Sequence, residues 1–272
     1  MIKRHPVLWF YLFAFAVSWA GMMPMMLYGR GSFPFTSPAF NALGGLGPTI
    51  AAIIVVVALN GRAGIKELFR PLLWGRVGIQ WYLAAFLGMP LLAGTGLIML
   101  SLFNGMTPDW GQFGPWVGVL PIFLINLLSN VWEEIGWRGF ALPRLQSRHN
   151  ALTASLIVGV PWAVWHFPLL FDPAHPMSNF PWYWVVINMT AMSVIYAWFY
   201  NNTRGSLLLV TLFHAASNTV AFALNTAIPA EAFALHYQYL TLAIVVAAVV
   251  AVLVFGAGSL SRQVDMPVAI QD

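Results

Sequence analysis

The stretch QWYLAAFLGMPLLAGTGLIMLSLF, residues 80–103, indicates the fold class because it contains no charged side chain. Roughly 20 apolar residues in a helix span the hydrocarbon core of a bilayer, where helices and closed barrels alone satisfy their backbone groups. The whole chain has the same character: of 272 residues, 60% are hydrophobic and 7% are charged, and the mean hydropathy is +0.77. This composition is typical of an integral membrane protein and excludes a soluble enzyme.

Seven further apolar runs lie on either side of this stretch, separated by turn-rich segments. We therefore expect an all-α polytopic membrane protein with about eight transmembrane helices, forming a single transmembrane domain over residues 1–272. The first run follows a basic start but is longer than the apolar part of a signal peptide, so we interpret it as a retained span. The predicted spans are 6–28, 44–59, 80–103, 115–137, 151–171, 181–200, 205–224 and 238–258.

The positions of the basic residues predict the orientation of these spans, because lysine and arginine concentrate in cytoplasmic loops. With a cytoplasmic N-terminus, ten of the 12 Lys and Arg residues lie on the cytoplasmic side, whereas Arg30 lies opposite and Arg138 lies inside a span. We expect a multi-pass protein of the cell membrane with both termini in the cytoplasm. The ten are Lys3, Arg4, Arg62, Lys66, Arg70, Arg76, Arg144, Arg148, Arg204 and Arg262.

The basic residues also bear on possible partners. The net charge of +4 could suggest a nucleic-acid partner, but the basic residues are scattered over short loops and form no basic face. Their placement fits orientation in the bilayer, so we expect membrane lipids as partners and no nucleic acid. Residues 61–76 mix apolar and basic side chains. We interpret this segment as an ordinary cytoplasmic loop, with an interfacial segment along the lipid headgroups as the alternative.

Very few ionisable groups lie within the predicted spans, where they are costly and usually functional. Glu133 and Glu134 lie in the fourth span together with Arg138. The fifth span contains His166, and the seventh contains His214 and the neutral Asn218. Because the chain has no cysteine, thiolate nucleophiles and thiolate zinc sites are excluded.

The spacing of these residues predicts that they meet. Glu134 and His166 are each 16 residues from Asn150, near which the fourth and fifth spans turn. In straight helices both would lie roughly 24 Å from this turn, at similar depth in the bilayer. His214 and Asn218 have i, i+4 spacing and share one helix face. We therefore expect spans four, five and seven to form one buried polar site.

The adjacent glutamates of the fourth span are expected to have different roles. Glu134 and Arg138 are spaced i, i+4, so Arg138 can pair with this carboxylate and hold it ionised. Glu133 points about 100° around the helix and is free to act as a general base. A purely structural alternative is that His214 and Asn218 form interhelical hydrogen bonds. We interpret four nearby tryptophans as packing or interfacial residues: Trp132, Trp137, Trp162 and Trp165.

The absence of several known protease motifs limits the possible mechanisms of hydrolysis. Every aspartate falls in a predicted loop or tail, which excludes an intramembrane aspartyl pair. The zinc-binding His-Glu-x-x-His and the nucleophilic Gly-x-Ser-x-Gly patterns are also missing. A carboxylate and imidazoles that activate water remain, together with neutral donors for a developing oxyanion.

Three motifs in this order resemble the CPBP intramembrane protease family, also called the Abi family. They are Glu-Glu-x-x-x-Arg-Gly at 133–139, aromatic-x-x-x-His at 162–166 and His-x-x-x-Asn at 214–218. This family includes type II CAAX prenyl endopeptidases and bacteriocin-processing or self-immunity proteins. The resemblance covers about residues 115–225, the expected catalytic core, and Gly47 and Pro48 also resemble the family. Trp162 stands where the family usually has phenylalanine, and we interpret both as aromatic packing residues.

The resemblance implies a division of catalytic roles. Glu133 and His166 would activate water, and His214 and Asn218 would stabilise the tetrahedral oxyanion. Glu134 and Arg138 would support them.

The resemblance also implies possible cofactors and substrates. The family has been described both as metalloproteases and as metal-independent glutamate proteases. Zinc would take Glu133, His166 and His214 as ligands, but Asn218 is a poor zinc ligand and a good donor, so we favour a glutamate protease without a cofactor. The expected substrate is a peptide or protein, prenylated or bearing a leader. The alternative function is a transporter or non-enzymatic membrane scaffold with a buried ion or proton path.

Overall fold

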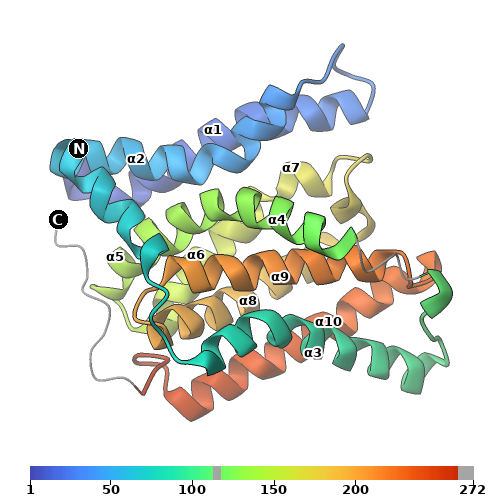
Figure 1. Cartoon of the computed structure of the whole chain (residues 1–272). Helices are drawn as coiled ribbons and strands as arrows, with labels where there is room; N and C mark the ends of the chain where they lie inside the picture. The colour runs from blue at the N-terminus through green and yellow to red at the C-terminus, as the bar shows by residue number, and fades with distance from the viewer. Residues whose placement is uncertain (113–117, 263–272) are drawn as a thin grey trace.

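The computed structural model describes residues 1–112 and 118–262 (Figure 1). Residues 115–117, with which the predicted fourth span and catalytic core begin, lie outside the described residues. Eight longer helices correspond to the eight predicted spans, and no strand occurs in the described ranges. They are α1 (Pro6–Gly29), α2 (Pro38–Phe69), α3 (Ile79–Asn104), α4 (Val119–Glu134), α6 (Ala151–Trp165), α8 (Trp182–Asn202), α9 (Leu207–Asn225) and α10 (Ala230–Phe255).

Shorter helical elements connect or extend these helices. They are η1 (Ile2–Arg4), η2 (Arg70–Leu73), η3 (Trp110–Gln112), η5 (Ile135–Ala141), α5 (Leu142–Gln146), α7 (Phe167–Leu170) and η6 (Pro176–Asn179).

The all-α, multi-pass fold is confirmed. Within the described residues, six helices are long and apolar enough to cross a membrane: α1, α2 with η2, α3, α4 continued through α5, α9 and α10. Helix α6 is apolar but has only 15 residues, and α8 is not among the six. The number of eight spans therefore stays a prediction.

Helix α2 is much longer than the predicted second span, 44–59. It begins at Pro38, which suits the first helical position, and the side chain of Ser37 caps it by accepting from the N–H of Ala39 at 3.3 Å. The helix kinks at Gly61, whose φ of +65° favours glycine. Residues 62–69 then continue as helix, so this part of the segment is regular, and its placement as a cytoplasmic loop or an interfacial segment stays a prediction.

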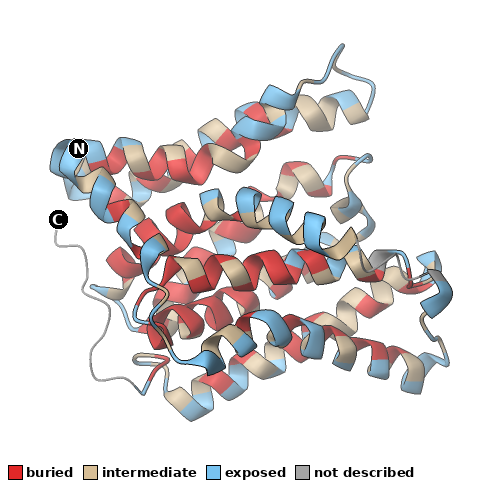
Figure 2. Ribbon diagram, viewed as in Figure 1, coloured by how far each residue is buried: buried red, intermediate tan, exposed pale blue. Residues whose placement is uncertain are grey.

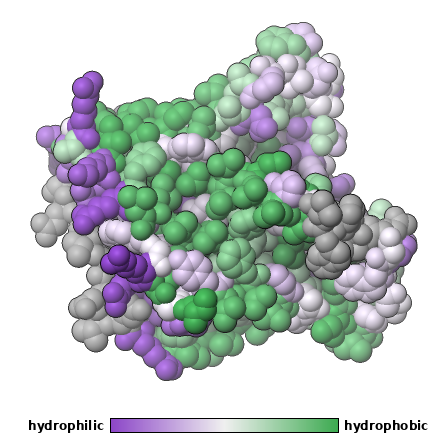
Figure 3. All heavy atoms as spheres, in the orientation of Figure 1, coloured by the Kyte–Doolittle hydropathy of each residue, from purple (hydrophilic) through white to green (hydrophobic). Residues whose placement is uncertain are grey.

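The predicted cytoplasmic loops lie together at one end of the molecule. The backbone N–H groups of Ala151 and Leu152 donate to the carbonyls of Gly258 and Ala257, at 2.9 and 3.1 Å. Nearby, the Asn202 side chain donates to the Leu260 carbonyl at 2.8 Å. Figure 3 shows hydrophilic side chains gathered at the end where the N-terminus lies, and apolar surface over the middle of this face.

Close helix packing places the first two helices against the functional region. A Cβ added at Gly47 would lie 2.9 Å from the backbone nitrogen of Ser18 on α1. A Cβ at Gly136 would lie 2.5 Å from Pro48 on α2. Helix α2 therefore approaches η5 too closely for a larger side chain at Gly136. Figure 2 shows buried residues concentrated along α6, α8 and α9, while exposed residues recur along α3 and α4.

Candidate active site

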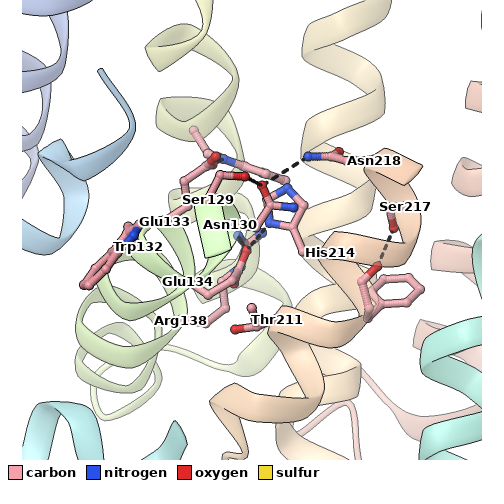
Figure 4. Close-up of polar contacts among 12 residues, drawn as sticks. Ser129, Asn130, Trp132, Glu133, Glu134, Arg138, Thr211, His214, Ser217 and Asn218 are labelled. Carbon is pink, nitrogen blue, oxygen red and sulfur yellow. Dashed lines mark hydrogen bonds and ion pairs between the residues drawn. The ribbon is translucent and has the colours of Figure 1, made fainter. Parts of the chain in front are cut away.

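The acidic motif lies where α4 changes its helix type. Helix α4 ends at Glu134, and η5 follows as a π-helix, which the sequence did not predict. Single π-helical turns inside α-helices are frequent at functional sites. The predicted pair is present: Nη1 of Arg138 donates to Oε1 of Glu134 at 2.9 Å, and both side chains are fully buried (Figure 4).

The same carboxylate oxygen links α4 to α9. Nδ1 of His214 lies 2.8 Å from Oε1 of Glu134, although the two residues are 80 positions apart. A carboxylate paired with Arg138 is an acceptor, so Nδ1 of His214 carries the hydrogen. The other ring nitrogen, Nε2, is left for the site. It accepts when the imidazole is neutral and donates when the ring is protonated.

His166 lies at the end of α6, where the helix breaks. Pro168 has no N–H to continue the helix ladder, and the N–H of His166 donates to Ala163 at 3.2 Å instead of to Trp162. The carbonyl of Trp162 is therefore available to Nδ1 of His166, at 2.9 Å. A carbonyl only accepts, so Nδ1 is the protonated nitrogen, and Nε2 is left with a lone pair. The helix predicted over 151–171 is therefore interrupted at His166, and α7 continues it after the break.

Trp162 occupies the centre of the site and does more than the packing predicted for it. Its indole N–H donates to Oε2 of Glu133 at 3.1 Å. The rings of His166 and His214 each lie 5.8 Å from its ring, edge to face. On the same indole, Cζ of Arg138 lies 4.2 Å from the ring centroid. One side chain thus contacts four of the predicted site residues.

The other tryptophans fit the packing interpretation in part. Trp137 and Trp165 are buried, and their rings contact each other at 6.1 Å. Trp132 is 37% exposed, one position before Glu133. A residue without a sequence signal also joins the site: the ring of Tyr196 on α8 lies 4.1 Å from Cζ of Arg138.

The last predicted site residue lies at the edge of the cluster. Asn218 is one turn after His214 on α9, as predicted, but its side chain is exposed, so the site opens to the molecular surface here. Its Nδ2 donates to Oδ1 of Asn130 at 3.2 Å. Asn130 was missed by the sequence analysis, although its place one helical turn before Glu134 puts it on the same face of α4.

A zinc ion would need ligands from Glu133, His166 and His214. Both imidazoles are oriented through Nδ1, and a set of two imidazoles and a carboxylate suits zinc chemically. Across residues 1–112 and 118–262, however, no three His, Asp or Glu side chains are placed to hold a metal ion.

Two comparisons with known proteins agree with the motifs. Residues 115–220 match the family model of Rce1-like type II CAAX prenyl endopeptidases. The chain is 26% identical to CAAX prenyl protease 2 of Methanococcus maripaludis over 233 residues. This alignment covers 79% of this chain and 83% of that relative. All six predicted site residues lie within the matched segment. The segment that holds the site is therefore similar to the Rce1-like type II CAAX prenyl endopeptidases, in agreement with the family predicted from the motifs.

Proposed function

We propose that this chain is an intramembrane endopeptidase that hydrolyses a peptide bond with water activated by Glu133 and His166. The observation that carries the proposal is the convergence of three side chains on the indole of Trp162. Its N–H binds Glu133, and the rings of His166 and His214 contact its edges and faces. These residues come from α4, α6 and α9, so the whole fold is required to bring them together.

Glu133 and His166 are suited to take a proton from water. Trp162 donates to Oε2 of Glu133, which holds the carboxylate in place and leaves Oε1 to accept the proton. Nδ1 of His166 is committed to the carbonyl of Trp162, so its Nε2 accepts a hydrogen bond from the same water. Both groups thus present acceptors to the attacking water.

His214 and Asn218 are suited to bind the negative oxygen that forms. The second N–H of Asn218 Nδ2 is free to donate after the first has bound Asn130. His214 has its Nδ1 hydrogen on Glu134, so its Nε2 donates only when the ring is protonated. Oε1 of Glu134 accepts from both His214 and Arg138, so one carboxylate orients both groups.

Hydrolysis would then proceed through a tetrahedral intermediate. The water oxygen bonds to the scissile carbonyl carbon while one water proton passes to Glu133, and the carbonyl oxygen becomes the oxyanion held by Asn218 and His214. When the intermediate collapses, the C–N bond breaks and Glu133 returns the proton to the leaving amine. The products are a carboxylic acid, which keeps the second water proton, and an amine; transfer of that proton to the amine gives a carboxylate and an ammonium group, and the enzyme is unchanged.

The proposed substrate is a prenylated peptide or protein that reaches the site from the membrane. This class is supported by the relative named as a CAAX prenyl protease. Asn218 is exposed and Glu133 is half-buried, so a peptide bond can approach from outside the helix bundle. Peptides that bear a leader are the second substrate class. Neither comparison favours the transporter or scaffold alternative.

The test is peptide cleavage by the purified protein in proteoliposomes. A farnesylated CAAX peptide is compared with the same peptide without the lipid, and Glu133→Gln is the matched variant because it keeps the side-chain shape. We expect cleavage of the lipidated peptide, with a loss of about 10²-fold or more in Glu133→Gln. Equal cleavage by the wild-type protein and Glu133→Gln, both free of host proteases, would overturn the proposal.

A further inference from the structure

Asn130 lies directly behind the proposed oxyanion donor Asn218. The side chain of Asn130 is 2% exposed, and its Oδ1 accepts from Asn218 Nδ2 at 3.2 Å (Figure 4). Ser129 Oγ donates to the same Oδ1 at 3.4 Å. The single hydrogen of this hydroxyl is shared with the nearer carbonyl of Asn126, at 3.1 Å, so the bond from Asn218 is the main one on Oδ1. A buried acceptor thus holds an exposed amide.

This bond also selects the orientation of the Asn218 amide. A primary amide presents two N–H donors on one side and an acceptor oxygen on the other. Because Oδ1 of Asn130 only accepts, the amide nitrogen of Asn218 is held on the side of α4. In the reverse orientation, the oxygen of Asn218 would face Oδ1 of Asn130 and this hydrogen bond would be lost. Asn130 therefore decides which end of the Asn218 amide is presented.

Packing alone does not explain an asparagine at position 130. Among the residues that the structure describes, its Nδ2 is buried without a hydrogen-bond partner. An unpaired buried donor lowers stability, and an apolar side chain of the same shape would avoid this cost. Its side-chain bonds all involve the oxygen, which accepts from Asn218 at 3.2 Å and from the neighbouring Ser129 at 3.4 Å, and Asn218 is the partner on another helix.

The helix offers a matched control one turn earlier. Nδ2 of Asn126 donates to Oγ1 of Thr219 on α9 at 3.0 Å. Asn126 and Asn130 thus make the same kind of interhelical bond between α4 and α9. Asn126 is the donor in its pair and is half-buried, whereas Asn130 is the buried acceptor in its pair, and the partner of Asn126 is not a proposed site residue.

We propose that Asn130 is a positioning residue for catalysis, which fixes the amide of Asn218 with an N–H towards the oxyanion. This inference rests on the proposed function of Asn218 as an oxyanion donor. It adds a residue outside the three sequence motifs to the catalytic arrangement.

A double-mutant cycle tests the inference with the full-length protein and the farnesylated peptide. kcat and KM are measured for Asn130→Leu, Asn218→Ala and the double variant, with Asn126→Leu as control. Asn130→Leu should lower kcat about tenfold, the effect of one lost hydrogen bond, with little change in KM. In the Asn218→Ala background, the same change should have almost no further effect. Asn126→Leu should keep wild-type kcat.

The outcomes separate this inference from the proposed function. Wild-type kcat in Asn130→Leu, or an equal loss with and without Asn218, would refute the positioning role, because a structural defect acts in both backgrounds. Full activity of Glu133→Gln would instead refute the proposed function. A second double-mutant cycle uses Asn130→Ala in place of Asn130→Leu, and the melting temperatures of all variants in detergent are compared with that of the wild-type protein. A folding defect of one variant therefore does not decide the result.

Discussion

Replacing Arg138 by alanine tests how strongly the ion pair supports the fold. The guanidinium is fully buried, donates to Glu134 at 2.9 Å and lies 4.2 and 4.1 Å from the rings of Trp162 and Tyr196. Breaking a buried ion pair costs about 3 to 5 kcal/mol, and a desolvated cation–π contact contributes up to about 2 kcal/mol. His214 still donates to Glu134 in the variant, which offsets part of the loss.

We therefore expect Arg138→Ala to lose about 5 kcal/mol of stability, a large share of the roughly 5 to 15 kcal/mol that stabilises a typical native protein. Yield and melting temperature in detergent should both fall. Asn218→Ala is the matched variant. It should lose about 1 to 2 kcal/mol of stability, while its turnover should fall about 10² to 10³-fold as an oxyanion donor is removed. A well-folded but inactive Arg138→Ala would refute this reasoning and place the arginine in the catalytic group.

Four further outcomes are expected. His166→Ala should lower kcat about 10²-fold or more in the protein that remains folded, and near-normal turnover would exclude His166 from water activation. Trp162→Phe keeps the ring but removes the N–H bound to Glu133, so kcat should fall about tenfold; wild-type kcat would show that this bond is dispensable. Activity should survive prolonged chelation and dialysis, whereas a loss restored by added zinc would favour a metalloprotease. Reporters fused to the two termini should both be active in the cytoplasm, and opposite locations would contradict the predicted orientation.

Much of the fold could be predicted because it depends on apolar length and residue spacing, which can be read directly from the sequence. Apolar length predicted the helices, and the i, i+4 spacing of Glu134 and Arg138 predicted their ion pair, which is confirmed. The convergence of α4, α6 and α9 was also predicted, since equal depths were calculated from the turn near Asn150. The catalytic roles assigned from the motifs remain predictions that the experiments above test.

The features that were missed depend on contacts between distant segments. A one-turn π-helix has no distinct residue pattern, so η5 could not be separated from the surrounding α-helix. The role of Trp162 depends on where its indole N–H points, which is fixed by the neighbouring helix. Asn130 is neutral and therefore did not stand out among ionisable residues, although it lies on the same helix face as Glu134.

The C-terminal turn at residues 256–261 has a practical consequence for protein engineering. Its carbonyls accept from the first two N–H groups of α6, which no helix can satisfy internally, and from the buried amide of Asn202. A truncation before Gly256 would remove these acceptors and loosen the start of the helix that ends at His166. An affinity tag attached after Arg262 leaves all of these bonds intact, so the C-terminus is a suitable fusion site as long as this turn is kept.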